Sequence, residues 1–255
     1  MDEHTHTTAE LKAYDWKSTG LSGQTAVIMG YGTAVADIVL QSLTEAGMKV
    51  AIVSRTQSKL DATAAKYNSK LGEGTVKGFS FDLGNVAGVK DLMASIANEM
   101  GAPIKAVYYN AAKFSLPYDA PAEDVVAACN VNFGTLWSTF GTVLEGWTAS
   151  DGGVFLMSGG GFAQNGAYSV GFGAQFGATQ KAFMKNFAES AQATHVEKGV
   201  HVCALEISGL VFGGDNVPSS FNSDPDGAEA FASRLKAAVG AALKDMTGQC
   251  YVSVQ

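Results

Sequence analysis

A glycine-containing turn follows the first apolar run of the chain. It lies between a predicted strand, Thr25–Met29, and a predicted helix, Ala34–Ala46. The N-terminus of a helix presents free backbone N–H groups and the positive end of the helix dipole, and small residues let a pyrophosphate approach the backbone closely. This pattern predicts a dinucleotide-binding turn; a plain tight turn is the alternative. The residues expected to contact the cofactor here are Gly30, Tyr31, Gly32, Thr33, Ala34 and Val35.

The end of the second predicted strand indicates which dinucleotide would bind. This strand, Lys49–Val53, is followed by Ser54 and Arg55, and no Asp or Glu stands between Gly47 and Lys59. An acidic residue in this region usually binds the ribose 2′-hydroxyl of NAD, whereas an arginine accommodates the 2′-phosphate of NADP. We therefore expect NADP(H) to be favoured over NAD(H), with Ser54 and Arg55 in contact with it. The alternative is that Arg55 is a solvated residue at the strand end.

The elements that position these residues alternate along the chain. Five further strands are expected at Phe79–Phe81, Ile104–Tyr109, Val154–Met157, Val200–Leu205 and Cys250–Val254, and Gly72–Gly78 is expected to be a loop. The helices are expected at Ser58–Leu71, Val86–Met100, a long region from Pro121, about Gly173–Glu197, and Ala228–Leu243. Strands separated by such helices indicate parallel βαβ units. We predict an α/β protein with a single-domain Rossmann fold over residues 21–255, after a flexible tail at residues 1–20. Its doubly wound, seven-stranded parallel sheet has helices on both faces.

Composition excludes several functional classes. The net charge of −7 argues against a nucleic-acid-binding or anionic membrane-binding surface, which would be basic. Cys129, Cys203 and Cys250 are odd in number and widely spaced, which indicates buried thiols in a reducing compartment and neither a disulfide framework nor a zinc site. The acidic, Thr-rich start of the chain is unlike a targeting peptide, and no run of 18 apolar residues is present. We expect a cytoplasmic protein without a membrane span or a metal site.

From about residue 21 to residue 254 the chain resembles the short-chain dehydrogenase/reductase family. Gly30, Ala34 and Ala36 hold the three places of the family's glycine turn, with alanine replacing the last two glycines, and Met246–Gln249 resembles its Thr-Gly-Gln before the last strand. Asp82-Leu83 resembles the pair that touches the adenine, and Asn110–Ala112 resembles the Asn-Ala-Gly that closes the fourth strand. The resemblance further implies a lid over Ser208–Asp226. The implied additional cofactor contacts are Asp82, Leu83, Asn110, Ala111, Ala112, Lys181, Gly209 and Val211.

The catalytic positions of the family are only partly matched. The family's serine maps to Ser158, and its Tyr-x-x-x-Lys maps to Gly177–Lys181, so the lysine is present and the tyrosine is absent. If the motif is aligned one residue earlier, Phe176 and Gln180 take the tyrosine and lysine positions, and both the phenol and the ammonium group are absent. Asn132 resembles the helix asparagine of the family's proton relay, with Asn130 as the alternative. The resemblance therefore implies a divergent branch that lacks the catalytic tyrosine.

The missing phenol raises the question of the proton donor. Reduction of a carbonyl requires an acid for the forming alkoxide, and a tyrosine beside a lysine ammonium normally supplies it. Ser158 and Lys181 still offer hydrogen bonds to a substrate oxygen and to the nicotinamide ribose. Tyr168, in a glycine-rich segment, is a candidate donor if that segment folds back, and otherwise a surface tyrosine. Glu206 is a more distant acid candidate, or a buried carboxylate with a local partner. The expected catalytic residues are Ser158, Lys181, Asn132 and Tyr168.

Three functions remain open from the sequence. The first is an NADP(H)-dependent oxidoreductase acting on a small carbonyl or alcohol substrate, with proton donation by Tyr168, water or substrate. The second is an inactive dinucleotide-binding sensor or scaffold, and the third is a non-redox lyase or cyclase. The resemblance also implies a homodimer or homotetramer paired through the helices around Ala120–Trp147 and Gly173–Glu197, which carry few charges.

Overall fold

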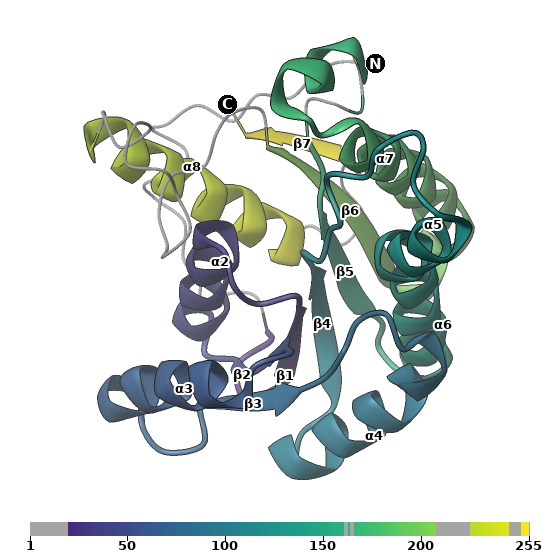
Figure 1. Ribbon diagram of the computed structural model, residues 1–255. Coiled ribbons are helices and arrows are strands. Elements are labelled where there is room, and N and C mark those ends of the chain that lie inside the picture. The colour runs from purple at the N-terminus through teal and green to yellow at the C-terminus, as the bar shows by residue number, and fades with distance from the viewer. Residues whose placement is uncertain (1–19, 161–162, 164–165, 208–224, 245–250, 255) are drawn as a thin grey trace.

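The fold is built on one sheet of seven parallel strands, in the order β3-β2-β1-β4-β5-β6-β7 (Figure 1). The computed structural model describes residues 20–160, 163, 166–207, 225–244 and 251–254. Of the predicted tail, only Gly20 lies within these residues. The strands are β1 (Thr25–Met29), β2 (Lys49–Ser54), β3 (Val76–Ser80), β4 (Ile104–Tyr109), β5 (Gly153–Ser158), β6 (Val200–Ile207) and β7 (Tyr251–Val254). The strand order reverses between β1 and β4, which is where doubly wound folds bind their ligands.

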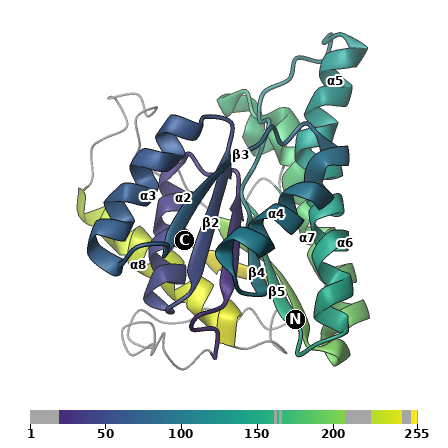
Figure 2. The same ribbon diagram turned by 90° about the horizontal axis from the view of Figure 1, so that it is seen from below.

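Helices cover both faces of this sheet, as the predicted βαβ units require (Figures 1 and 2). Helices α2, α3 and α8 lie on one face, and α4, α6 and α7 lie on the other. Their bounds are α2 (Ala34–Glu45), α3 (Gln57–Leu71), α4 (Val89–Met100), α5 (Ala122–Cys129), α6 (Thr135–Thr148), α7 (Gln175–His195) and α8 (Pro225–Lys244). The prediction of a Rossmann fold with a seven-stranded parallel sheet is confirmed.

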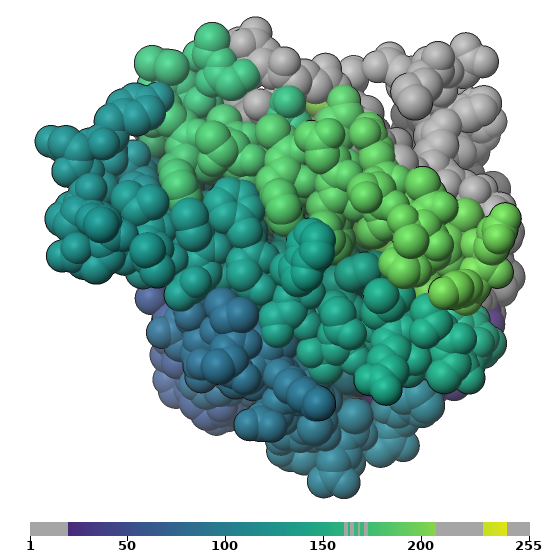
Figure 3. Space-filling model, turned by 90° about the vertical axis from the view of Figure 1, so that its right-hand side faces the viewer, coloured from purple at the N-terminus to yellow at the C-terminus, as the bar shows by residue number. Residues whose placement is uncertain are grey.

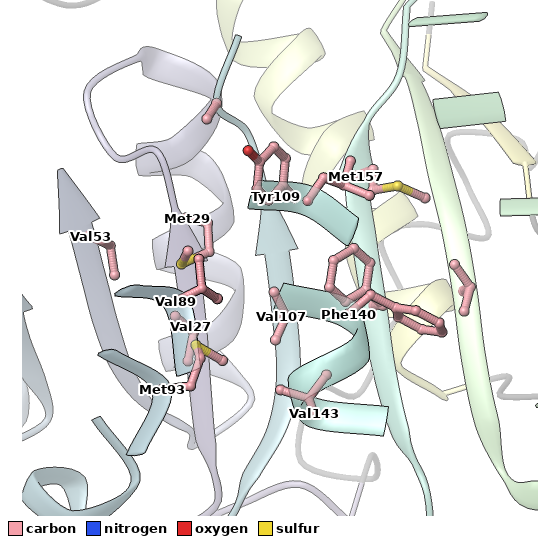
Figure 4. Packing of buried hydrophobic residues seen from close by; sticks show 14 of the residues in the cluster. Val27, Met29, Val53, Val89, Met93, Val107, Tyr109, Phe140, Val143 and Met157 are labelled. Atoms are coloured by element: carbon pink, nitrogen blue, oxygen red, sulfur yellow. The ribbon is translucent and has the colours of Figure 1, made fainter. Parts of the chain in front are cut away.

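The core consists of two hydrophobic layers, one on each face of the sheet. Successive strand residues point to opposite faces, so Ile28 packs with α2 and α8, whereas Val27 and Met29 pack under α4 and α6. Figure 4 shows the second layer, in which Val89 of α4 and Phe140 of α6 lie over the strands. Because both faces are covered, the strands are apolar almost throughout, as is usual in parallel sheets.

Strand β3 begins earlier than the sequence indicates. The prediction of a loop over Gly72–Gly78 is wrong for its last three residues, which pair with β2. The side chain of Asn68 on α3 accepts from the Val76 N–H at 2.8 Å and donates to its carbonyl at 3.0 Å. Gln57 likewise donates to the Gly78 carbonyl and accepts from the Ser80 N–H. The two carboxamides thus form hydrogen bonds with backbone groups of β3 at the outer edge of the sheet. They stabilise a strand that its own glycine content does not favour.

The long helical region predicted from Pro121 is divided into two helices. Helix α5 ends at Cys129, and a π-helical turn, η3 (Asn130–Gly134), precedes α6. A π-turn adds a residue to the helical repeat and re-aims the side chains within it. This turn carries Asn132, so the irregularity falls on a predicted site residue.

Two structural features were expected to be absent, and the described residues contain neither. Within these ranges, none of the helices has the length and apolar character that a membrane-spanning helix requires. The same part of the chain brings no three His, Cys, Asp or Glu side chains together as a metal site.

Candidate active site

The glycine turn after β1 requires glycine at its first position. Gly30 has a φ of +94°, and a Cβ atom there would lie 2.6 Å from the backbone nitrogen of Ala111. The N–H groups of Gly30 and Tyr31 donate to the Val53 carbonyl at 3.0 and 2.8 Å, which fixes the turn on β2. Thr33 then caps α2 by accepting from the Ala36 N–H at 3.3 Å. The turn thus lets a pyrophosphate come close to the backbone, and it leads into the N-terminus of α2, which favours an anion.

Tyr31 is predicted to contact the cofactor, but its hydroxyl group points away from the turn. It donates to the Asp37 carboxylate at 2.8 Å, and the Tyr67 hydroxyl of α3 donates to the same oxygen at 3.0 Å. Burial, together with the Asp37 carboxylate, raises the pKa of both phenols, so they remain neutral donors. The Tyr31 side chain therefore anchors the turn to α2 and α3.

The residues predicted to select the dinucleotide lie at the ends of β2 and β3. Arg55 is exposed directly after β2, and its carbonyl accepts from the Ser80 hydroxyl at 3.0 Å. Asp82 is exposed and accepts from the Gly84 N–H at 2.9 Å, while Leu83 is buried. An exposed guanidinium at this edge is available to a phosphate group.

Asn110 connects the glycine turn to the end of β5. Its Nδ2 atom donates to the Gly30 carbonyl at 3.0 Å and to Thr33 Oγ1 at 3.1 Å. Its Oδ1 atom accepts from the hydroxyl group of Ser158 at 2.6 Å. One side chain therefore joins the predicted phosphate-binding turn and the predicted catalytic serine.

A buried tyrosine completes a chain of hydroxyl groups at Ser158. The oxygen atoms of Tyr108 and Ser158 lie 2.6 Å apart. Because the single hydroxyl hydrogen of Ser158 goes to Asn110, Tyr108 must be the donor in this pair. Burial raises the pKa of Tyr108, which keeps its phenol protonated. Without a ligand Ser158 therefore keeps one free lone pair, and it can donate to a ligand when its hydrogen turns away from Asn110.

Lys181 of α7 lies beside Ser158. Its ammonium group donates to the Ser158 carbonyl and lies 5.3 Å from the centroid of the Phe114 ring. The side chain is buried, and this burial lowers the pKa of Lys181 to about 8. The two catalytic residues predicted from different parts of the chain are therefore in contact.

Phe114 is a site residue that the sequence does not reveal. Its carbonyl accepts from the Gly177 N–H at 2.9 Å, and a Cβ atom at Gly177 would lie only 2.3 Å from the ring carbon Cδ1. The ring thus fills the space where residue 177 would carry a side chain, one helical turn before Lys181. The available signal was the expected presence of glycine where the resemblance places the family's tyrosine, since another group must then occupy that space.

The π-turn and α7 together hold the loop that carries Phe114. Asn132 is fully buried; its Oδ1 accepts from the Lys113 N–H at 2.6 Å and its Nδ2 donates to the Lys113 carbonyl at 3.0 Å. Gln180 donates to the carbonyls of Ala111 at 2.8 Å and Asn132 at 3.4 Å. The alternative residue, Asn130, is the C-cap of α5, so Asn132 is the asparagine that faces this loop.

The other predicted residues are placed only in part. Tyr168 belongs to the short helix η5 (Gly166–Phe172), but its side chain is outside the described part of the structure. Glu206 is buried near the end of β6 and takes part in an interaction. Ala111 lies against Gly30, Val35 is part of the core, and Ala112 is half-buried. Gly209, Val211, Met246–Gln249 and most of the lid predicted over Ser208–Asp226 lie outside the described residues. The last two residues of that lid, Pro225 and Asp226, begin helix α8.

Comparison with known proteins agrees with this geometry. The family model for short chain dehydrogenases matches residues 24–211, which is well over half of the chain. No curated protein matched the sequence at a significant level.

Three solved structures have a similar fold. A protein from Novosphingobium aromaticivorans assigned to the short-chain dehydrogenases has a TM-score of 0.75 at 18% identity, covering 92% of this chain and 82% of its own. A protein from Beutenbergia cavernae, assigned as an NAD(P)-dependent gluconate 5-dehydrogenase and solved with NADP at low occupancy, has a TM-score of 0.73 at 18% identity, covering 92% and 96%. A short-chain oxidoreductase from Pseudomonas aeruginosa with an atypical catalytic centre has a TM-score of 0.74 at 15% identity, covering 92% and 97%. With its glycine turn, its parallel sheet and this match, the chain belongs to the short-chain dehydrogenase family.

Proposed function

We propose that this protein is an NADP(H)-dependent oxidoreductase that acts on a small carbonyl or alcohol substrate. The observation that carries the proposal is the contact of Ser158 with Lys181, joined to the glycine turn through Asn110. When bound, the dinucleotide supplies or accepts a hydride. The backbone from Gly30 to Val35 would hold its pyrophosphate and Arg55 its 2′-phosphate. The further contacts would come from Ser54, Asp82, Leu83, Asn110, Ala111, Ala112, Lys181, Gly209 and Val211.

Residues of the chain itself would bind the substrate and exclude water from the site. A substrate carbonyl oxygen would take the Ser158 hydrogen that Asn110 accepts in the free site, while Tyr108 continues to donate to Ser158 and to orient it. Lys181 offers its remaining N–H groups. The Phe114 ring, which is 44% exposed, provides an apolar wall above Lys181 that keeps water from it.

Arg55→Ala tests the dinucleotide preference. A charge-assisted hydrogen bond to a phosphate contributes about 1.5–3 kcal/mol. We therefore expect the dissociation constant for NADPH to rise about 10–100-fold, with little change for NADH, which lacks the 2′-phosphate. Calorimetric titration of both dinucleotides measures this difference. Lys59→Ala is the matched control, since Lys59 is exposed one helical turn further on; equal losses in both variants, or unchanged NADPH binding in Arg55→Ala, would contradict the assignment.

One feature of the same site favours a second function, that of an inactive dinucleotide-binding sensor or scaffold. The hydrogen of Ser158 is already donated to Asn110, and Gly177 carries no hydroxyl group. The dinucleotide-binding residues are therefore retained, whereas hydroxyl groups that could protonate a substrate are lacking at these two positions. A sensor or scaffold of this kind would bind NADPH and show no turnover with any carbonyl substrate. The oxidoreductase predicts both binding and turnover.

We also propose that the protein is a homo-oligomer paired through α5, α6 and α7, the face seen in Figure 3. Trp137 on α6 is 63% exposed and Val126 on α5 is 59% exposed, and Trp137 forms a T-shaped pair with Phe187 of α7. Exposed aromatic residues on a face with few charges are typical of protein interfaces. Light scattering should show a dimer or tetramer that Trp137→Glu dissociates. Leu71→Glu, a control on α3 at the opposite face of the sheet, should leave it intact; a monomeric wild type would refute the proposal.

We further propose a cytoplasmic location. Cys203 is buried in the core and Cys129 is half-buried, and neither forms a disulfide within the described residues, which supports a reducing compartment. Cys250 lies outside the described residues.

A further inference from the structure

The site contains few groups that can exchange a proton. The Ser158 hydrogen is donated to Asn110, and the Tyr108 hydroxyl lies behind Ser158 and donates to it. Asn132 and Gln180 are amides and do not titrate. Among the described residues in contact with Ser158, this leaves the ammonium group of Lys181 as the only group able to release a proton near neutral pH.

We propose that Lys181 itself protonates the substrate oxygen during carbonyl reduction and removes that proton during alcohol oxidation. This inference rests on the proposed function. In the reductive direction an N–H bond of the ammonium breaks as an O–H bond forms on the alkoxide, which leaves a neutral amine and an alcohol. The two electrons that reduce the carbonyl carbon come with a hydride from a reduced nicotinamide dinucleotide. After the alcohol has left the site, solvent returns a proton to the amine.

The position of Lys181 suits this role. Only one of its three N–H groups is donated to the Ser158 carbonyl, so two remain for the nicotinamide ribose and the substrate oxygen. The side chain is 5% exposed, and burial lowers the pKa of Lys181 to about 8, close to the value that makes a good general acid at neutral pH. An ordinary lysine, with a pKa of about 10.4, would hold its proton too tightly.

Phe114 is the positioning residue in this arrangement. Its ring packs directly against Gly177 and faces the Lys181 ammonium, where it both excludes water and attracts the cation. The lysine stem passes Gly160 on its other side, since a Cβ atom there would lie 3.5 Å from Lys181 Cγ. The ionisable groups on the described surrounding segments include Tyr108 on β4, exposed Lys113 beside Phe114, and Glu206 on β6. Of these, Glu206 is the competing acid.

A direct titration of Lys181 tests the proposal without a cofactor. Lysine residues are labelled by reductive ¹³C-methylation, and their NMR signals are followed against pH in the wild type and in Lys181→Arg. We expect one signal with an inflection near pH 8 that is missing from the variant, because burial is the cause of the low pKa. A Lys181 signal that titrates at the ordinary lysine value would overturn the proposal.

The kinetic test uses the same variant. Arginine keeps the positive charge but does not deprotonate in proteins. Lys181→Arg should therefore still bind NADPH, while kcat for carbonyl reduction falls about 100-fold or more. In the wild type, reduction should decline as pH rises through the Lys181 pKa, and alcohol oxidation should increase over the same range. Lys185→Arg, one turn further along α7, is the matched control and should retain the wild-type rate and profile.

The outcomes separate this inference from the proposed function. If the wild type neither binds NADPH nor turns over a carbonyl substrate, the proposed function fails. If the wild type is active and Lys181→Arg keeps its rate and its pH profile, only the role of Lys181 fails. An inflection that persists in Lys181→Arg and disappears in Glu206→Gln or Tyr168→Phe would assign the proton to that residue and overturn the proposal.

Discussion

Gly30→Ala is expected to abolish measurable NADPH binding and to lower the free energy of unfolding by about 2–4 kcal/mol, through backbone strain and overpacking together. The new Cβ atom would lie 2.6 and 2.8 Å from two backbone atoms of Ala111, at a φ of +94°. Neither atom can rotate away, so the end of β4 must move. That movement displaces Asn110 and breaks its link between the turn and Ser158.

Gly74→Ala is a control that introduces backbone strain without displacing a neighbouring residue. Gly74 has a φ of +77° in the loop before β3, but no atom lies within 4 Å of a Cβ built there. We expect this control to lose about 1 kcal/mol of stability and to bind NADPH normally. Calorimetric titration and chemical unfolding of both variants provide the comparison. Normal NADPH binding by Gly30→Ala would show that the turn is not the phosphate site.

Ser158→Ala is expected to lower kcat/KM for carbonyl reduction by about 100–1000-fold, the typical cost of a lost hydrogen bond to the reacting oxygen. NADPH affinity should change little, because the glycine turn remains in place. The variant should also lose about 1–3 kcal/mol of stability, since the buried Tyr108 hydroxyl is left without its partner. Steady-state kinetics and chemical unfolding measure the two effects separately.

A double-mutant cycle assigns the stability loss to the Tyr108–Ser158 pair. Removing both partners is less costly than leaving one buried polar group unsatisfied. Tyr108→Phe combined with Ser158→Ala should therefore be more stable than Ser158→Ala alone, while its activity stays low. Ser190→Ala, at an exposed position of α7, is the control and should match the wild type. Independent, additive losses would contradict the hydroxyl chain.

Most of the fold follows from local patterns in the sequence. The apolar runs predict β1 and β4 to the residue and the other strands to within a few residues, because a parallel sheet covered on both faces needs continuous apolar strands. The exception is the start of β3, which is stabilised by Asn68 and Gln57 of α3 and not by its own residues. The π-turn before α6 was also missed, since a helical pattern does not reveal an extra residue in its repeat.

The residues of the candidate site likewise include some that local motifs predict and others that only tertiary contacts reveal. The glycine turn, Ser158 and Lys181 were predicted because their motifs are local or are matched by the family. Phe114 was not predicted, because its contact with Gly177 joins residues far apart in the chain. Tyr108 was predicted only to lie in the fourth strand. The sequence does not show that its hydroxyl reaches Ser158 on the neighbouring strand, a contact that depends on the register of β4 and β5.

The most direct test of the account is the oxidation of NADPH by small aldehydes and ketones, followed by nicotinamide absorbance in the wild type and in Ser158→Ala. We predict substrate-dependent oxidation by the wild type with at least one class of carbonyl compound, and its near-complete loss in the variant. Tight binding of NADPH without oxidation by any carbonyl compound, or equal rates in the two proteins, would contradict hydride transfer at this site.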